Sequence, residues 1–162
     1  MPGLIVILMG SMSDEPHGRR IAEAARSLML DVDIRVGSAH KAPGHVLDLL
    51  REYEADPRPK VYVTVAGLSN ALSGLVDGAV SAPVIACPPP GDAFSGMDVL
   101  SSLRMPAGIA PAVVLEPANA ALCAAKILGL GDAAIRAAVA EHQRRNRSQV
   151  EEADRSLHPR IP

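Results

Sequence analysis

The sequence predicts a three-layer α/β fold, a doubly wound parallel sheet of about five strands with helices on both faces. Short apolar runs alternate along the chain with segments whose apolar residues recur at helical spacing, a pattern typical of βαβ units. The strand-like runs also look apolar throughout, as expected for strands that are covered on both faces. Five strands of this kind suit the flavodoxin-like order 2-1-3-4-5.

Each element follows from a local pattern. The predicted strands cover residues 4–9, 32–37, 61–66, 83–87 and 112–115. Helices are predicted after Asp14, which is a plausible N-cap, and after Pro43 and Asn70, because apolar residues recur there at i, i+3, i+4 and i+7. Three prolines within residues 88–92 predict a stiff loop after the fourth strand.

The C-terminal part of the chain differs from the rest. An Ala-rich helix with a small face is predicted over residues 118–128, and a second helix from Asp132 onward. Beyond His142 the second helix has few apolar positions to bury against its own domain. We therefore expect a single domain over residues 1–162. Its helical extension, about 131–162, would lie across a neighbouring subunit, with both C-terminal helices used in assembly.

Composition excludes several classes of protein. A formal net charge of −2 provides no basic face for nucleic acid, and one Phe, two Tyr and no Trp leave almost no aromatic platform for a flavin. No apolar run reaches the ~20 residues that span a bilayer, and we expect no secretory signal before the first strand. Two cysteines are too few for a zinc site. We expect a cytoplasmic protein that binds neither membrane nor metal.

Two short loops carry the strongest functional signal. Gly-Ser-Met-Ser-Asp (10–14) follows the first predicted strand, and Ser-Ala-His-Lys (38–41) follows the second. A loop of small residues between a strand and a helix leaves backbone N–H groups free to hold a phosphate. Because the carboxyl ends of parallel strands meet at one edge of the sheet, the two loops should share a site. The sequence therefore predicts an enzyme for a small phosphorylated substrate.

The side chains of these loops suit a phosphorylated sugar and a proton transfer. In the first loop, Gly10 is followed by Ser11 and Ser13, which can donate to phosphate oxygens, and by Asp14, which can accept from ribose hydroxyls. A purely structural turn, with Ser and Asp as helix caps, would have the same composition.

In the second loop, Ser38 is followed by His40, whose imidazole can move a proton near neutral pH, and by the cation Lys41. The other histidines are assigned to surface or capping positions: His17, His45, His142 and His158.

The loop after the third strand offers a further set of donors. Residues 66–71 half-resemble the nucleophile elbow of serine hydrolases, but Ala71 stands where that motif needs Gly. Backbone N–H groups at Gly67, Ser69 and Asn70 would instead hold a carboxylate or carbon dioxide oxygen at the start of a helix. The chain also lacks the motifs of P-loop and dinucleotide-binding proteins.

Five motifs in order give the chain a family resemblance. The sequence resembles the phosphoribosylaminoimidazole (AIR) carboxylases and mutases of purine biosynthesis, and within them the class II carboxylases. The resemblance runs from Ile5 to about Leu130. The motifs are Met-Gly-Ser-x-Ser-Asp (9–14), Ser-Ala-His-Lys (38–41), Ala-Gly-x-Ser-Asn-Ala-Leu-Ser-Gly (66–74), Cys-Pro-Pro-Pro (87–90) and Ser-Ser-Leu-Arg-Met-Pro (101–106).

The resemblance implies a reaction and an assembly. Carbon dioxide would carboxylate 5-aminoimidazole ribonucleotide to 4-carboxy-5-aminoimidazole ribonucleotide, in a carbon–carbon lyase that uses no ATP, biotin or other cofactor. His40 would remove the ring proton, and Lys41 with the 67–70 backbone would hold the carboxylate. Family members are commonly homo-oligomers, so an octamer is expected, with a tetramer as the second possibility.

Two alternatives stay open, and one departure from the family pattern supports the second of them. Leu68 stands where class II members usually have Arg. Class I mutases usually carry Arg after the histidine and a second histidine in the third loop, whereas this chain has Lys41 and Ser69-Asn70 there. The alternatives are an N-carboxyaminoimidazole ribonucleotide mutase and a catalytically silent nucleotide-binding homologue.

Overall fold

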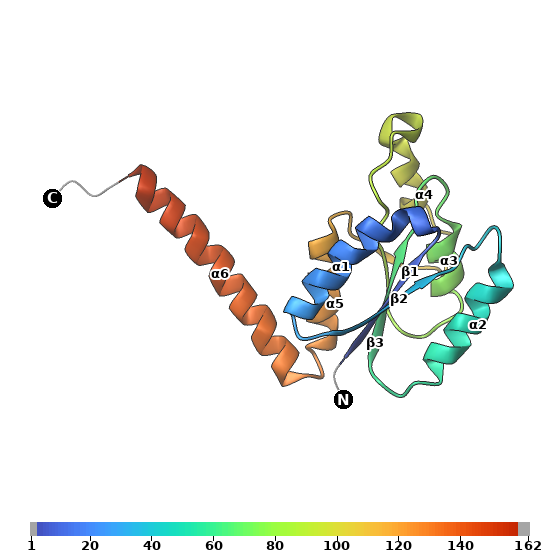
Figure 1. Ribbon diagram of the computed structural model, residues 1–162, viewed down its shortest axis with the longest axis horizontal. Helices are drawn as coiled ribbons and strands as arrows, with labels where there is room; N and C mark the ends of the chain where they lie inside the picture. Colours follow the sequence, from blue (N-terminus) through green and yellow to red (C-terminus); the bar gives the residue numbers. More distant parts are fainter. Residues whose placement is uncertain (1–2, 159–162) are drawn as a thin grey trace.

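A parallel sheet in the order β2-β1-β3-β4-β5 forms the centre of the molecule, with helices on both faces (Figure 1). The computed structural model describes residues 3–158 of the chain. The predicted fold class and strand order are confirmed. The strands are β1 (Leu4–Met9), β2 (Asp31–Val36), β3 (Lys60–Val65), β4 (Val84–Ala86) and β5 (Ala112–Val113).

The central strand β1 divides its side chains between two cores. Side chains alternate along a strand, so Ile5, Ile7 and Met9 face one layer of helices while Leu4, Val6 and Leu8 face the other. All six are buried. On the first face lie α1 (Glu15–Ser27) and α5 (Pro117–Leu128), and on the second lie α2 (Pro43–Glu54) and α3 (Ala71–Asp77).

The edge strand β2 differs from the prediction that the strands are apolar throughout. It reads Asp-Val-Asp-Ile-Arg-Val, and none of its six residues is fully buried. Because β2 is an edge strand, its charged side chains can reach solvent and neighbouring helices. Arg35, for example, donates to Glu52 of α2 at 3.2 Å. β4 and β5 are also shorter than predicted, at three and two residues.

The small face of α5 packs within the chain, where the sequence predicted a subunit contact. Ala121, Ala124 and Ala125 are 0% exposed and belong to the same core as Ala22 and Ala25 of α1. Small side chains on both helices permit this close approach.

The last helix, α6 (Ala133–Leu157), leaves the body of the domain (Figure 1). It begins at Asp132, whose carboxylate accepts the N–H groups of Ala134 and Ile135 at 2.8 and 3.1 Å. Ile135 and Val139 are buried against the core. From residue 143 onward every described residue is exposed. No helix in the described part of the chain is both long and apolar enough to span a membrane.

Three short helical elements lie near the carboxyl edge of the sheet. A 3₁₀ turn, η1 (Met12–Asp14), precedes α1. Between β4 and β5 lie η2 (Ala93–Val99) and the single turn α4 (Leu100–Leu103). Inside η2 the backbone is left-handed at Phe94, Ser95 and Gly96, so this segment is a kinked connection rather than one helix.

Candidate active site

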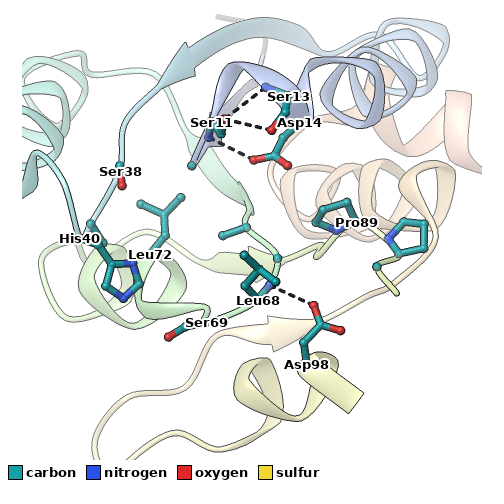
Figure 2. Close-up of a pocket in the computed structure, with 16 residues that line it drawn as sticks. Ser11, Ser13, Asp14, Ser38, His40, Leu68, Ser69, Leu72, Pro89 and Asp98 are labelled. Atoms are coloured by element: carbon teal, nitrogen blue, oxygen red, sulfur yellow. Dashed lines mark hydrogen bonds between the residues drawn. The ribbon is translucent and has the colours of Figure 1, made fainter. Parts of the chain in front are cut away.

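A cavity of about 320 Å³ opens at the carboxyl edge of the sheet, where the loops after β1, β2, β3 and β4 meet (Figure 2). Most of the predicted site residues line it. They are Gly10, Ser11, Ser13 and Asp14 after β1, Ser38 and His40 after β2, and Gly67 and Ser69 after β3. Lys41 and Asn70 are not among the lining residues.

The side chains of the first loop bond one another. Ser11 N–H donates to Asp14 Oδ2 at 3.1 Å, and the N–H and hydroxyl of Ser13 both donate to Ser11 Oγ, at 3.3 and 3.0 Å. Asp14 precedes α1, where we predicted an N-cap, but its carboxylate turns back to Ser11 and closes a capping box around η1. The structural and the binding interpretations of this loop therefore use the same atoms.

The environment of Asp14 changes its acidity. Burial raises the pKa of its carboxyl, and the Ser11 N–H and the nearby His17 lower it by less. The result is a carboxyl group that faces the cavity while its charge is only partly solvated.

The second loop forms a turn that brings His40 to the cavity. Ser38 accepts twice, through Oγ from the Lys41 N–H at 3.2 Å and through its carbonyl from the Ala42 N–H at 2.9 Å. Figure 2 shows the His40 ring on the cavity wall near Leu72. Lys41 is exposed just outside the cavity.

The third loop presents fewer free backbone donors than predicted. Leu68 N–H donates to Asp98 Oδ2 at 2.9 Å, and Asn70 N–H donates to Ser101 Oγ at 3.1 Å. Asn70 is itself buried as the N-cap of α3, where its Oδ1 accepts from the N–H and hydroxyl of Ser73. Its predicted binding role thus competes with a structural one, and the exposed Ser69 is the polar side chain of this loop that the cavity retains.

The sequence analysis did not assign the opposite wall to the site. This wall is formed by Pro89, Pro90, Gly91 and Asp98. The proline loop was predicted to follow the fourth strand, and the carboxyl ends of parallel strands meet at one edge of the sheet. The same argument would therefore have placed this loop in the site. Asp98 carried no such signal, because η2 has no periodicity that fixes its path.

The charges around the cavity are mainly negative. Within residues 3–158, its ionisable lining groups are Asp14, His40 and Asp98, and neither Lys nor Arg is among them. An anionic ligand would therefore be held here by hydroxyl and backbone N–H groups, not by a buried cation.

His17 departs from its predicted surface or capping position. Its side chain is buried behind the first loop, and its Nε2 lies 3.4 Å from Cys87 Sγ. Burial lowers the pKa of His17, with a further decrease from Arg20. Burial also raises the pKa of Cys87 to about 12, so this thiol stays protonated. His17 lines a second cavity of about 400 Å³ on the far side of the proline loop.

A known family matches most of the chain. A family model described as AIR carboxylase matches residues 4–149. The chain belongs to the AIR carboxylase family. The predicted family resemblance is confirmed.

The relatives match nearly the whole length of the chain. A phosphoribosylaminoimidazole carboxylase of Treponema denticola is 52% identical over 157 residues, which is 97% of this chain and 99% of that protein. One of Archaeoglobus fulgidus is 48% identical, over 94% of this chain and 83% of that protein. The crystal structure of Treponema denticola PurE has a TM-score of 0.94 to this fold at 52% identity, covering 98% of this chain and 99% of that one.

Proposed function

We propose that this enzyme carboxylates 5-aminoimidazole ribonucleotide with carbon dioxide, giving 4-carboxy-5-aminoimidazole ribonucleotide in purine biosynthesis, without ATP or biotin. Membership of the AIR carboxylase family supports the reaction class. The observation that carries the assignment to this site is the meeting of His40 with the Ser11–Asp14 loop in one cavity. A proton carrier and a set of phosphate and ribose ligands are thereby within reach of one small nucleotide.

The first two loops would bind the ribonucleotide. The hydroxyls of Ser11, Ser13 and Ser38 line the cavity and would donate to phosphate oxygens. Asp14, partly buried beside them, would accept from ribose hydroxyls. Binding would break the hydrogen bond between Ser13 and Ser11 and replace it with bonds to the ligand.

The chemistry needs one proton acceptor at the ring. Aminoimidazole is an electron-rich enamine, so its ring carbon can attack the carbon of carbon dioxide and form a carbon–carbon bond. That ring carbon then carries both the new carboxylate and a proton, and loss of the proton restores aromaticity. His40 takes this proton as general base.

The third loop would hold the carboxyl end of the reaction. Gly67 and Ser69 line the cavity there, and Lys41 supplies a positive charge at the rim beside His40. Leu68 and the opposing prolines make this end of the cavity more apolar, which suits a neutral gas and limits competition by water.

The same proposal extends to assembly and location. We expect a closed homo-oligomer in the cytoplasm, an octamer with a tetramer as the second possibility. The projecting half of α6 supports this expectation, because it has little core of its own.

The decisive experiment supplies the two possible carboxyl donors separately. We expect turnover of aminoimidazole ribonucleotide with dissolved carbon dioxide, and little turnover of the N-carboxy ribonucleotide in buffer purged of carbon dioxide. Efficient use of the N-carboxy compound under those conditions would refute the carboxylase assignment in favour of a mutase. No turnover with either donor would indicate a silent homologue.

A further inference from the structure

The loop after β3 is held from outside by one short segment, residues 98–102. Asp98 Oδ2 accepts the Leu68 N–H at 2.9 Å, and Ser101 Oγ donates to the Leu68 carbonyl at 3.3 Å. Ser101 Oγ also accepts the Asn70 N–H at 3.1 Å, and Asn70 Nδ2 donates to Ser102 Oγ at 2.8 Å. The sequence distance is about 30 residues, so these are tertiary contacts between two loops.

The backbone that this segment holds is not in a relaxed conformation. Leu68 has φ 60°, in the left-handed region that costs free energy for any residue with a Cβ. Its side chain is 68% exposed, so core packing does not stabilise this conformation. The two hydrogen bonds of the Leu68 peptide groups are the contacts that do, and Figure 2 shows the one that the Leu68 N–H donates to Asp98 at the cavity wall.

Asp98 also reaches the opposite wall of the cavity. A Cβ built on Gly91 would lie 3.3 Å from Asp98 Oδ2, and one built on Gly67 would lie 3.8 Å from it. The carboxylate therefore lies between the loop after β3 and the proline loop after β4, close to both. Asp98 and Ser69 both line the cavity there.

We infer that Asp98 is a positioning residue of this active site, which fixes the loop 67–70 at the geometry that receives the carboxyl group. This inference rests on the proposed carboxylation. Asp98 acts as a hydrogen-bond acceptor for the Leu68 N–H. The position of the loop therefore depends on the acceptor oxygen of Asp98 and not on its negative charge. The phosphate and ribose ligands belong to the loops after β1 and β2 and make no contact with Asp98 in the described hydrogen bonds.

Three variants test the inference. Asp98→Ala removes the acceptor, Asp98→Asn keeps an acceptor oxygen without the charge, and Asp92→Ala is the matched control, an exposed carboxylate nearby that does not line the cavity. For Asp98→Ala we expect kcat/KM for carbon dioxide to fall about 10- to 100-fold. The dissociation constant of aminoimidazole ribonucleotide, measured by calorimetry, should keep the parent value. Asp98→Asn and Asp92→Ala should stay close to the parent in both.

A second readout does not depend on turnover. Hydrogen exchange of the Leu68 amide should be faster in Asp98→Ala than in the parent, and close to the parent in Asp98→Asn. Parent-like kcat/KM in Asp98→Ala would overturn the inference. So would an equal loss in Asp98→Asn, which would make the charge itself the requirement, or a proportional loss of ribonucleotide affinity. If the parent enzyme itself carries out no carboxylation, the proposed function fails, and unchanged Leu68 exchange in Asp98→Ala would separately reject the positioning.

Discussion

At the scale of single residues, several side chains of the site have two tasks. Ser11 and Asp14 close the capping box before α1 and also face the cavity. Their mutual hydrogen bonds hold them at the cavity before any ligand arrives, which lowers the conformational entropy lost on binding. Asn70 shows the opposite outcome, because both ends of its buried amide already bond within the protein, the oxygen to Ser73 and the nitrogen to Ser102.

The role of His40 leads to a direct prediction. His40→Asn removes the proton acceptor but leaves the serines of the loops after β1 and β2 in place. We therefore expect kcat to fall by about 10²–10⁴-fold while the affinity for the ribonucleotide is kept. Steady-state kinetics and calorimetry on the same preparation measure both quantities. His45→Asn is a suitable control, because His45 is exposed on α2 and does not line the cavity. Turnover near the parent rate in His40→Asn would show that another group takes the proton.

The raised pKa of Asp14 predicts how its substitution changes stability with pH. Since burial raises this pKa above its value in the unfolded chain, the folded state favours the protonated carboxyl. The contribution of this protonated carboxyl to the free energy of unfolding is complete below the ordinary pKa of 3.8. It is lost as the pH rises through the raised pKa of the folded state. At neutral pH the ionised carboxylate therefore destabilises the fold, and Asp14→Asn should raise the midpoint of thermal unfolding by a few degrees at most.

That gain should shrink as the pH falls toward the ordinary pKa of Asp14, because the parent carboxyl is then protonated too. Asn can still accept the Ser11 N–H through its amide oxygen, so the cap is preserved. Thermal scans across this pH range measure the difference, with Asp92→Asn as the exposed control. A lower midpoint for Asp14→Asn at neutral pH would contradict the prediction.

The sequence predicted a residue's place in the candidate site where that residue directly follows a recognisable strand. Ser11, Asp14 and His40 each follow a predicted strand. Because the carboxyl ends of parallel strands meet at one edge of the sheet, the sequence placed these residues together. Asp98 and His17 were missed for different reasons. Asp98 lies in an irregular segment, whereas the burial of His17 depends on packing against Cys87, which is 70 residues away in sequence.

At the scale of elements, the β1–α1 unit depends on close contact beneath the first loop. A Cβ built on Gly18 of α1 would lie 2.6 Å from Sδ of Met9, the last residue of β1. The absence of a side chain at this position lets the first turns of α1 approach the strand end that carries the loop. Gly44 of α2 has nothing within 4 Å of such a Cβ.

These two glycines predict opposite effects of the same substitution. Gly18→Ala should lower the free energy of unfolding by about 1 kcal/mol, because overpacking costs about 1–3 kcal/mol and the gain in helix propensity offsets part of it. Gly44→Ala should leave stability unchanged or raise it by up to about 1 kcal/mol. Denaturant unfolding measures both. Equal effects of the two substitutions would show that Met9 moves aside without cost.

Elements were predicted well where hydrophobic periodicity is strong and poorly where it is weak. β1 begins and ends at the predicted residues, because it is buried on both faces. β2 contains charged residues that its edge position tolerates. The prediction that every strand is apolar throughout therefore described β2 less well than β1. The kink at Phe94 and Ser95 has no sequence signal, since both residues adopt a left-handed backbone that a Cβ disfavours.

At the scale of the whole molecule, the C-terminal half of α6 is the least supported part of the described chain. Val150 and Leu157 are 71% and 77% exposed, on a helix segment without contact to the domain core. An isolated helical segment of this length is marginal in water without packing. A second copy of the chain is the partner that a homo-oligomer would supply.

Removal of the C-terminal half of α6 tests whether this segment contacts a second copy of the chain. A chain ending at Ala140 should form a smaller assembly or unfold at a lower temperature, because residues 141–157 contribute little to the domain's own core. Light scattering and thermal unfolding measure the two effects. Val150→Asp should act in the same direction, and Glu151→Gln should not. An unchanged mass and midpoint for both Val150→Asp and the shortened chain would show that α6 takes no part in assembly.

The position of β1 at the centre of the sheet has a consequence for synthesis on the ribosome. This strand is made first, yet its neighbour β3 ends at Val65, and α5, which completes the cover of one face, ends at Leu128. At roughly 5–20 residues per second, translation leaves six consecutive apolar residues incompletely covered for several seconds or longer. The nascent chain is therefore a natural client for chaperones that shield apolar segments, and slow translation before α5 should increase its tendency to aggregate.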